Sequence, residues 1–493
     1  MPRPAAIVAT CLILLAFLPG LSNMAHAADA ALRAGAAAST LTPALGSPII
    51  GGFAPFPATH VHDELHARCL VLDDGTTKLA LVVCDLLGLH SNVSDEARRR
   101  IEATTGIPKS CVLISGTHTH SAASVLGKSR LVRDVPLDAY QQFVAQRIAD
   151  AVQCAHNTLR PAELAVGTVD IPEHVFNRRW HLRPGTMPEN PFGTIDLVKM
   201  NPGAGSPNLV EPAGPTDPQV SFLAVREPDG KPISVFTTYS LHYVGGVGNG
   251  HISADYYGYF CEHLARLLKT DQFDPPFVAL LANGTSGDIN NINFRTPRPG
   301  QPAYKQMQYV AEDVATKVHA RLPELKYARD IRLDARYREP VLNRRPLTPE
   351  QLAWAKTTLE TRPEVAGKTD LSRIYAERTQ ALAAAPESVA VPVQVLAIGD
   401  ALIGTMPCEV FCEIGLEFRS RCPQQPAFMV SLNHGYMGYL PTPRQHDLGG
   451  YETWIGTNQL EREASVKLLN ELIAMTEEIV AARKGKGGST NDK

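Results

Sequence analysis

Two histidines, His118 and His120, follow an apolar run at residues 111–114 and are separated by a single threonine. The apolar run is typical of a short buried strand, and alternate side chains of an extended chain lie on the same face. The spacing therefore predicts two imidazoles that project together beyond a strand end. One could bind a metal ion while the other transfers protons. In a chain with 16 histidines the spacing also arises by chance, so the rest of the sequence has to decide.

Two further polar side chains come directly after predicted strands. His242 follows the strand expected at residues 233–239, and Glu409 follows the one expected at residues 401–406. Strand ends meet at one edge of an α/β sheet, where ligands usually bind. Two histidines and a carboxylate are the donors of many catalytic zinc sites. Because zinc lowers the pKa of a bound water to about 7 and polarises a carbonyl, the set favours hydrolysis of an amide or ester. Taken singly, His242 is more typical of a structural histidine and Glu409 of a surface turn.

The elements expected to position these residues alternate between strand and helix, which predicts an α/β fold. Strands at 69–72 and 79–84 form a hairpin, and a helix at 94–104, capped by Ser94, precedes the first histidine pair. Further helices are predicted at 137–157, 256–268, from 348 onward and at 461–483, and the one from 348 opens with a cap at Thr348 followed by a proline. Further strands are predicted at 220–225, 277–281 and 391–398. The Pro/Gly-rich span 181–219 is expected to form a lid or rim, or else a plain surface excursion.

The ends and the composition of the chain predict its compartment. Residues 1–27 have the pattern of a cleavable signal peptide, with Arg3, an apolar segment and the cleavage site Ala25-His26-Ala27. This predicts a periplasmic or secreted protein, with an uncleaved anchor as the alternative. We expect a single catalytic domain at 28–484 and a disordered tail at 485–493. A formal net charge of -3 gives no basic field for nucleic acid, and the cysteines imply no disulfide framework.

The motifs around these residues resemble a known family. The chain is similar to the N-terminal catalytic domain of the neutral/alkaline (non-lysosomal) ceramidases, zinc amidohydrolases that cut ceramide into sphingosine and fatty acid. The resemblance runs from about Arg33 to about Trp454. It is carried by the order and spacing of Ser115-Gly116-Thr117-His118-Thr119-His120-Ser121, Asn177-Arg178, Leu241-His242, Ser253-Ala254-Asp255, Gly287-Asp288-Ile289, Pro407-Cys408-Glu409, Tyr439 and Tyr451. It implies central mixed β-sheets flanked by helices, without the family's C-terminal β-sandwich, for which too few residues follow Tyr451.

The resemblance also implies roles for individual residues. The implied zinc ligands are His118, His242, Glu409 and Tyr439. His120 would move a proton beside the metal, Tyr451 would stabilise the oxyanion, and Arg178 would orient the substrate. Asp288 and Asn290 map to a segment at the ceramide site. Asn290 stands where the family has a serine, and an amide can hydrogen-bond but cannot act as an alkoxide nucleophile.

The function implied is zinc-dependent hydrolysis of an N-acyl amide, with a ceramide-like lipid as substrate and transient contact with a membrane surface. Another N-acyl substrate, or a non-catalytic lipid- or glycan-binding relative, is the alternative within the same scaffold. Two rivals come from other folds. One is a TIM-barrel metallo-amidohydrolase, in which His-x-His also follows a strand. The other is a serine hydrolase centred on Ser286, whose surroundings do not form Gly-x-Ser-x-Gly.

Overall fold

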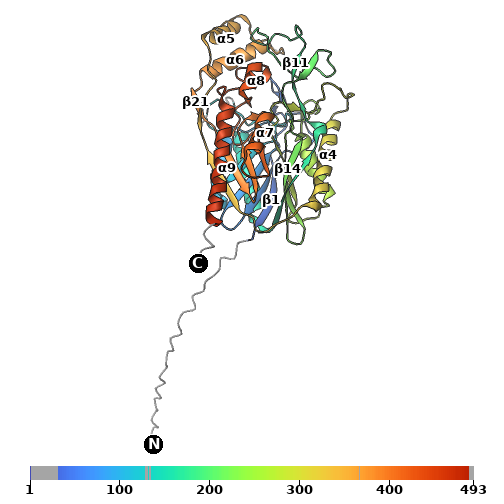
Figure 1. Ribbon diagram of the computed structural model, residues 1–493, viewed down its shortest axis with the longest axis vertical. Helices are drawn as coiled ribbons and strands as arrows, with labels where there is room; N and C mark the ends of the chain where they lie inside the picture. The colour runs from blue at the N-terminus through green and yellow to red at the C-terminus, as the bar shows by residue number, and fades with distance from the viewer. Residues whose placement is uncertain (2–30, 128–130, 133–134, 366, 488–493) are drawn as a thin grey trace. The chain divides into compact units, whose positions relative to one another are not determined.

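The computed structural model describes residue 1 and residues 31–127, 131–132, 135–365 and 367–487 (Figure 1). The predicted signal peptide lies outside the described residues except for Met1, and so do residues 488–493 of the predicted tail. Helix α9 (Ala464–Gly487) continues three residues into the span predicted as tail. Within the part of the chain that is described, no helix is both long enough and apolar enough to cross a membrane.

The first sheet carries the strand that leads to His118, and its strand order is β7-β6-β5-β1-β8. Its strands are β1 (Arg33–Thr40), β5 (His66–Asp73), β6 (Lys78–Cys84), β7 (Val112–Gly116) and β8 (Arg160–Pro161). Strands β5 and β6 pair antiparallel, which confirms the predicted hairpin. Strands β6 and β7 pair parallel through α1 (Ser91–Thr105), which confirms the predicted strand–helix–strand order. Helix α2 (Ala139–Asn157) packs on α1 and on β1 and β5.

The start of α1 differs from the prediction. The helix is capped by His90, whose Nδ1 accepts from the Asn92 N–H at 3.2 Å, and not by Ser94. Ser94 lies inside the helix, fully buried, with its Oγ 3.1 Å from Nδ1 of His434. The cap prediction was wrong because a histidine nitrogen can also accept the free N–H groups of a helix start. In contrast, Thr348 caps α5 (Pro349–Thr361) with Gln351, as predicted.

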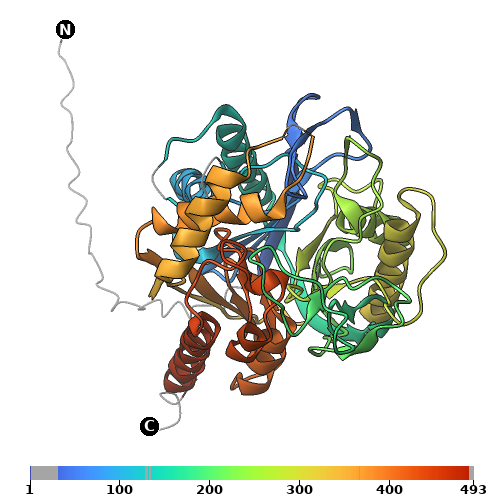
Figure 2. The same cartoon turned by 90° about the horizontal axis from the view of Figure 1, so that it is seen from above.

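The second sheet carries His242, in the strand order β17-β15-β14-β9. Its strands are β9 (Glu163–Asp170), β14 (Gln219–Arg226), β15 (Pro232–Tyr239) and β17 (Val278–Asn283). Strands β15 and β17 are parallel, so their carboxyl ends lie at the same edge. Helices α3 (Asp255–Leu267) and α4 (Lys305–Arg321) pack together and cover this sheet from outside (Figure 2).

The third sheet carries β23, the strand that leads to Glu409, in the strand order β19-β22-β23-β25. Its strands are β19 (Leu333–Arg338), β22 (Val393–Ile398), β23 (Ala401–Thr405) and β25 (Ala427–Val430). Helices α7 (Cys412–Arg421) and α9 pack on its outer side. Helices α5 and α6 (Leu371–Ala383) pack as a pair, and α8 (Pro443–Leu448) follows the third sheet.

Five short strand pairs and one short three-stranded sheet among the described residues complete the fold. They are β2 (Pro48–Ile49) with β3 (Phe56–Pro57), β4 (His60–Val61) with β16 (His251–Ile252), β10 (Phe176–Asn177) with β18 (Ile289–Asn290), β20 (Val341–Asn343) with β21 (Ser388–Ala390), β24 (Glu409–Val410) with β26 (Tyr439–Leu440), and β11 (Arg179–Leu182) between β12 (Lys199–Met200) and β13 (Leu209–Pro212). The mixed sheets flanked by helices confirm the predicted α/β class.

A central hydrophobic core joins the three sheets. Leu81 and Ile114 of the first sheet, Phe236 of the second and Leu396 and Ile403 of the third belong to the same buried cluster. Separate clusters lie under α3 and α4 and under α7 and α9. Because one continuous core fixes the sheets against each other, the strand ends that carry His118, His242 and the approach to Glu409 are held as a unit.

Asp63, in the segment before β5, ties the chain to the loop beside the first histidine pair. Its carboxylate accepts from Ser253 Oγ and from the Ala254 N–H, both at 2.6 Å. The Ser253 carbonyl in turn accepts from Thr119 Oγ1 at 2.7 Å. Asp63 therefore supports the backbone between His118 and His120 through a single intermediate residue.

The partly buried carboxyl of Asp63 predicts a pH-dependent stability. Burial raises the pKa of Asp63 to about 6. A raised folded-state pKa means that the stabilising contribution is complete below the unfolded pKa of about 4 and is lost as the pH rises through about 6. Asp63→Asn cannot ionise, so its stability relative to wild type should be about 2–3 kcal/mol more favourable at about pH 7 than at about pH 4. Urea unfolding at both pH values, with exposed Asp229→Asn as control, measures this difference. If Asp63→Asn changed the free energy of unfolding by the same amount at both pH values, the prediction would be contradicted.

Candidate active site

His118 lies just beyond β7 in a left-handed backbone conformation, with φ of 72°. The prediction of an extended backbone at His118 is therefore wrong, because β7 already ends at Gly116. Left-handed residues other than glycine cost energy and cluster at functional sites. The His118 N–H donates to the Leu86 carbonyl, and Nδ1 lies 2.6 Å from the Leu87 carbonyl. Nδ1 must carry the proton in that contact, which leaves the Nε2 lone pair available.

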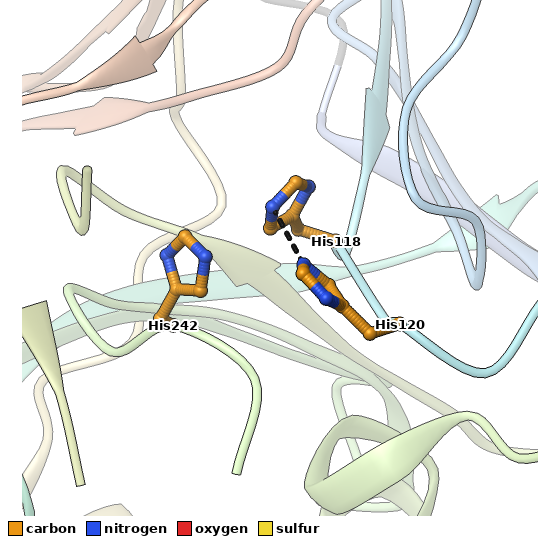
Figure 3. A group of neighbouring side chains, drawn as sticks. All are labelled: His118, His120 and His242. Carbon is orange, nitrogen blue, oxygen red and sulfur yellow. Dashed lines mark hydrogen bonds between the residues drawn. The ribbon is translucent and has the colours of Figure 1, made fainter. Parts of the chain in front are cut away.

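His120 faces His118 despite this change of backbone (Figure 3). Nε2 of His120 lies 3.1 Å from Nε2 of His118, and the two rings meet edge to face. Burial, followed by the neighbouring His118, lowers the pKa of His120 well below its ordinary value. His120 is therefore neutral near pH 7 and can accept a proton.

His242 approaches from the second sheet, where it follows β15. Its Nδ1 lies 3.1 Å from the carbonyl of Ser286, which follows the parallel neighbour β17. This contact again leaves Nε2 free. One nitrogen from each of His118, His120 and His242 lies within 4.8 Å of the others, and the group could hold a metal ion.

Glu409 completes a cluster of donors around His118 and His242. Its Oε2 lies 3.3 Å from Nε2 of His118 and 3.7 Å from Nε2 of His242, and its side chain is 3% exposed. The hydroxyl of Tyr436 donates to Oε1. Burial alone would raise the pKa of Glu409, but His118 and His242 lower it below its usual range. The structure thus brings together the strand-end residues that the sequence singled out.

The orphaned atoms of this cluster fit a metal ion. Glu409 Oε2 and His242 Nε2 are buried and have no hydrogen-bond partner among the described residues. Buried polar atoms rarely stay unsatisfied, and a shared cation satisfies both. Two ligand atoms at zinc distances of ~2.0–2.2 Å on a tetrahedron lie about 3.3–3.6 Å apart. Glu409 Oε2 lies 3.3 Å from His118 Nε2, within that range, and 3.7 Å from His242 Nε2, just above it.

Tyr439, Tyr451 and Arg178 lie together beside the cluster. Tyr439 is paired with Glu409 in the β24–β26 ladder, and its ring lies 5.7 Å from that of Tyr451. The guanidinium carbon of Arg178 lies 5.3 Å from the Tyr439 ring. Arg178 Nε donates to Glu452 at 2.9 Å, while its buried Nη2 has no partner among the described residues. Burial raises the pKa of Tyr451, so its hydroxyl remains a donor at neutral pH.

These residues line one cavity of about 970 Å³. Its walls also include residues 50–53, residues 187–191, Arg378 from α6 and Trp454. The span 181–219 therefore supplies a rim of the cavity, which is one of the two outcomes expected for it. A volume of this size accommodates a drug-sized or lipid-like ligand.

Asp288 and Asn290 do not line this cavity, although substrate contacts were predicted for both. The Asp288 carboxylate accepts from Asn177 Nδ2 and from the Cys412 N–H, both at 2.8 Å. Asn290 donates to Asn201 Oδ1 at 2.8 Å. Their polar atoms are used to hold β10, β12 and β18 together, so they support the wall without forming its surface.

The fold and cavity also decide between the rivals. The strands form several separate mixed sheets and no closed parallel barrel among the described residues, so a TIM barrel is wrong. Ser286 is 3% exposed, donates to Asn283 Oδ1 at 2.7 Å and does not line the cavity. A nucleophile in that position could not reach a substrate in the cavity.

Three site residues were missed by the sequence analysis. Tyr243 stacks flat on His120, with ring centroids 3.7 Å apart and an interplanar angle of 17°. Tyr436 holds Glu409, and Glu452 accepts from Arg178 and Arg179. In the sequence, Tyr243 is next to His242 and Glu452 is next to Tyr451. This adjacency to predicted site residues was the only sign that Tyr243 and Glu452 could belong to the site. Which neighbour turns inward depends on the tertiary fold.

The site and fold define a mixed α/β protein with a buried histidine–carboxylate cluster at the carboxyl ends of parallel strands. The family model "Neutral/alkaline non-lysosomal ceramidase, N-terminal" matches residues 35–331, and the chain belongs to this family. Glu409, Tyr439 and Tyr451 lie beyond the matched residues. The chain is 23% identical to neutral ceramidase B of Dictyostelium discoideum over 57% of its own length and 38% of that protein. With neutral ceramidase A it is 23% identical over 39% of its length and 25% of that protein.

Solved structures share the fold. The neutral ceramidase from Pseudomonas aeruginosa superposes with a TM-score of 0.66 and 17% identity, covering 91% of this chain and 75% of that one. A ceramidase complexed with C2 gives a TM-score of 0.63 and 16% identity over 92% of this chain and 76% of that one. The matched region thus spans well under half of each Dictyostelium relative but most of each solved chain.

Proposed function

We propose that this protein is a zinc-dependent amidohydrolase that cleaves the N-acyl bond of a ceramide-like lipid, giving a fatty acid and a sphingoid base. The observation that carries the proposal is the pair of orphaned buried atoms, Glu409 Oε2 and His242 Nε2, at the cavity in a chain of this family. His118, His242, Glu409 and Tyr439 would hold the zinc ion. When bound, zinc supplies Lewis acidity, which polarises a carbonyl and lowers the pKa of water.

The chain's own residues supply the remaining chemistry. Neutral His120 accepts a proton from the attacking water through the nitrogen that faces His118, and it returns the proton to the amine as the C–N bond breaks. The Tyr451 hydroxyl donates to the carbonyl oxygen as negative charge develops there. The free Nη2 of Arg178 donates to an oxygen of the substrate and so orients it. Tyr243 keeps the His120 ring in place by stacking on it.

The test is an activity screen on purified protein, stripped of metal and then reloaded. A short-chain ceramide and simple N-acyl amines are offered with zinc, with magnesium and with no metal. We expect amide cleavage that disappears with chelation and returns with about one zinc per chain. Full activity in a chelator-resistant protein with substoichiometric metal would overturn the zinc assignment, and absence of turnover on every amide would favour a non-catalytic binding protein.

Tyr451→Phe tests the oxyanion role. Removing one donor to a developing oxyanion costs about 10²-fold in kcat, while KM should change little because the ground-state carbonyl needs the hydroxyl less. Steady-state kinetics with a soluble short-chain amide measure the split. Tyr309→Phe, which changes an exposed tyrosine on α4 in the same way, serves as control. A Tyr451→Phe enzyme with wild-type kcat would remove Tyr451 from the mechanism.

Transient contact with a membrane surface is part of the proposal, because apolar side chains surround the cavity mouth. Phe53 lines the cavity and is 39% exposed. Ile195 and Leu197 flank the cavity residue Asp196 and are 57% and 60% exposed. Exposed apolar groups beside a lipid-sized cavity are typical of a surface that meets lipid.

Ile195→Ser combined with Leu197→Ser should reduce sedimentation with neutral phosphatidylcholine vesicles about tenfold, because two exposed aliphatic side chains contribute roughly 1–2 kcal/mol to burial in lipid. Hydrolysis of a soluble short-chain amide should stay within twofold. The control is the double variant Val341→Ser with Val466→Ser, which changes two exposed aliphatic residues elsewhere on the surface. Equal sedimentation of all proteins would contradict a docking role for this rim.

We also propose export to the periplasm or the medium, on the basis of the signal-like pattern in residues 1–27. Expression of the full chain in a bacterial host, followed by fractionation and N-terminal sequencing, tests it. The expected mature terminus is Ala28, and an intact Met1 on cytoplasmic protein would contradict it.

A further inference from the structure

Arg378 is a cavity residue whose positive charge has no carboxylate partner among the described residues. It extends from α6 to the cavity wall, with its guanidinium carbon 5.4 Å from the Phe53 ring and 5.0 Å from the Tyr375 ring. Its Nη1 donates to Thr457 Oγ1 at 3.2 Å. Arg378 forms no ion pair with any carboxylate in the described part of the chain. A guanidinium carries five N–H donors, so most of its donors remain available to a ligand.

The neighbouring arginines add to this excess of positive charge. Arg178 Nε and Arg179 Nη1 both donate to Glu452, at 2.9 Å and 2.6 Å, so a single carboxylate serves two cations. Nη2 of Arg178, on a side chain that is 5% exposed, has no partner among the described residues. A buried, unpartnered guanidinium nitrogen at a cavity indicates a ligand oxygen.

The other acidic side chains of the cavity do not neutralise these arginines. Asp196 accepts from the Trp454 indole N–H at 2.9 Å, and Glu189 lies on the exposed rim. Neither of them forms an ion pair with Arg178 or Arg378 within the described ranges. Glu409 is turned toward the histidines.

Tyr451 lies between the two arginines. Its ring is 6.4 Å from that of Phe53, which Arg378 covers, and 5.7 Å from that of Tyr439, which Arg178 covers. Burial raises the pKa of Tyr451, and the charges of Arg378 and Arg178 both oppose that rise. Since the Tyr451 hydroxyl is proposed to contact the scissile carbonyl, an anion bound by these arginines would lie close to the amide.

We propose that the preferred substrates are N-acyl compounds that carry a carboxylate or phosphate next to the amide, and that Arg378 is the residue that selects them. The planar fork of arginine suits both anions, and the aromatic rings of Phe53 and Tyr375 hold the guanidinium in place. The proposal rests on the proposed amide hydrolysis at this site, and it narrows the class of N-acyl substrates to those with an anionic group on the amine side. Ceramide itself would then be a slower substrate than an acylated amine of the same chain length with an adjacent anion.

The test compares three amides with one acyl chain: N-lauroylglycine, N-lauroylethanolamine and N-lauroylphosphoethanolamine. The first two differ mainly in a carboxylate against a hydroxymethyl group, and the third separates phosphate from carboxylate. We expect wild-type kcat/KM to favour at least one of the two anionic amides over the neutral one by at least tenfold. Arg378→Met should reduce this preference to less than twofold through KM and leave the neutral amide within twofold of wild type. Arg378→Lys should keep part of the preference, which shows that charge and not packing is responsible.

Arg373→Met, on the same helix at a position that does not line the cavity, is the matched control and should behave as wild type. Thermal melts establish that the Arg378 variants are folded. Equilibrium dialysis of N-lauroylglycine and N-lauroylethanolamine against wild type and Arg378→Met gives a readout that does not need turnover. Equal affinity of wild type for the two amides, or an equal loss for both in Arg378→Met, overturns the inference. Cleavage of the neutral amide or ceramide without preference for an anion overturns this inference alone, whereas absence of any cleavage overturns the proposed function.

Discussion

The Glu409→Gln variant is expected to lose roughly a thousandfold in kcat/KM and to retain little metal after dialysis. Its carboxylate is the only negatively charged group within 4 Å of the described nitrogens of His118 and His242. A metal ion that acts as a Lewis acid stabilises the transition state by several kcal/mol, and each 1.36 kcal/mol is about tenfold in rate. Glutamine keeps the volume and the hydrogen bond from Tyr436 but removes the charge that attracts a cation. Metal per chain and amidase kinetics are the two measurements.

Two further variants show whether the loss of activity and metal comes from the Glu409 carboxylate itself. Glu417→Gln makes the same chemical change on the exposed face of α7 and should match wild type in both measurements. Tyr436→Phe removes only the hydroxyl that orients Glu409, so we expect a loss of about 10–100-fold with metal partly retained, as for other residues that hold a ligand. A Glu409→Gln protein with full metal content and near-normal rate would exclude Glu409 from the ligand set and favour the three histidines alone.

The Glu452→Ala variant is expected to lower the free energy of unfolding by about 3–5 kcal/mol, the largest stability effect that we predict. Glu452 is fully buried and accepts from Arg178 at 2.9 Å and from Arg179 at 2.6 Å. Its removal leaves two guanidinium groups in the interior without a carboxylate, and uncompensated buried charge is strongly destabilising. Activity should fall as well, because Arg178 loses the contact that holds it at the cavity.

Chemical unfolding of Glu452→Ala and Glu463→Ala provides the comparison. Glu463 pairs with Arg462 at the surface, and its side chain is 49% exposed, so its loss should cost no more than about 1 kcal/mol. If both variants lose the same small amount, the Arg178–Glu452–Arg179 cluster does not stabilise the fold as its burial implies.

Local patterns determined much of the fold before any tertiary information. The hairpin of β5 and β6, the strand–helix–strand order of β6, α1 and β7 and the Thr348 cap were all predicted, because alternation, turn residues and caps act within a few residues of each other. The Ser94 cap was wrong, because His90 caps the helix and Ser94 lies inside it, where its hydroxyl contacts His434, a residue far away in the sequence.

The sequence by itself determined which residues of the candidate site stand at strand ends and, through the family resemblance, which of them to expect together. Only the tertiary structure decided how they meet. His118 and His120 face each other through a left-handed turn and not along a strand, and Tyr243 stacks on His120. Arg378 reaches the cavity from a separate helix and has no carboxylate partner among the described residues. The physical reason is that strand ends are specified by local patterns, whereas side-chain partners and charge balance depend on which distant segments the shared core packs against each other.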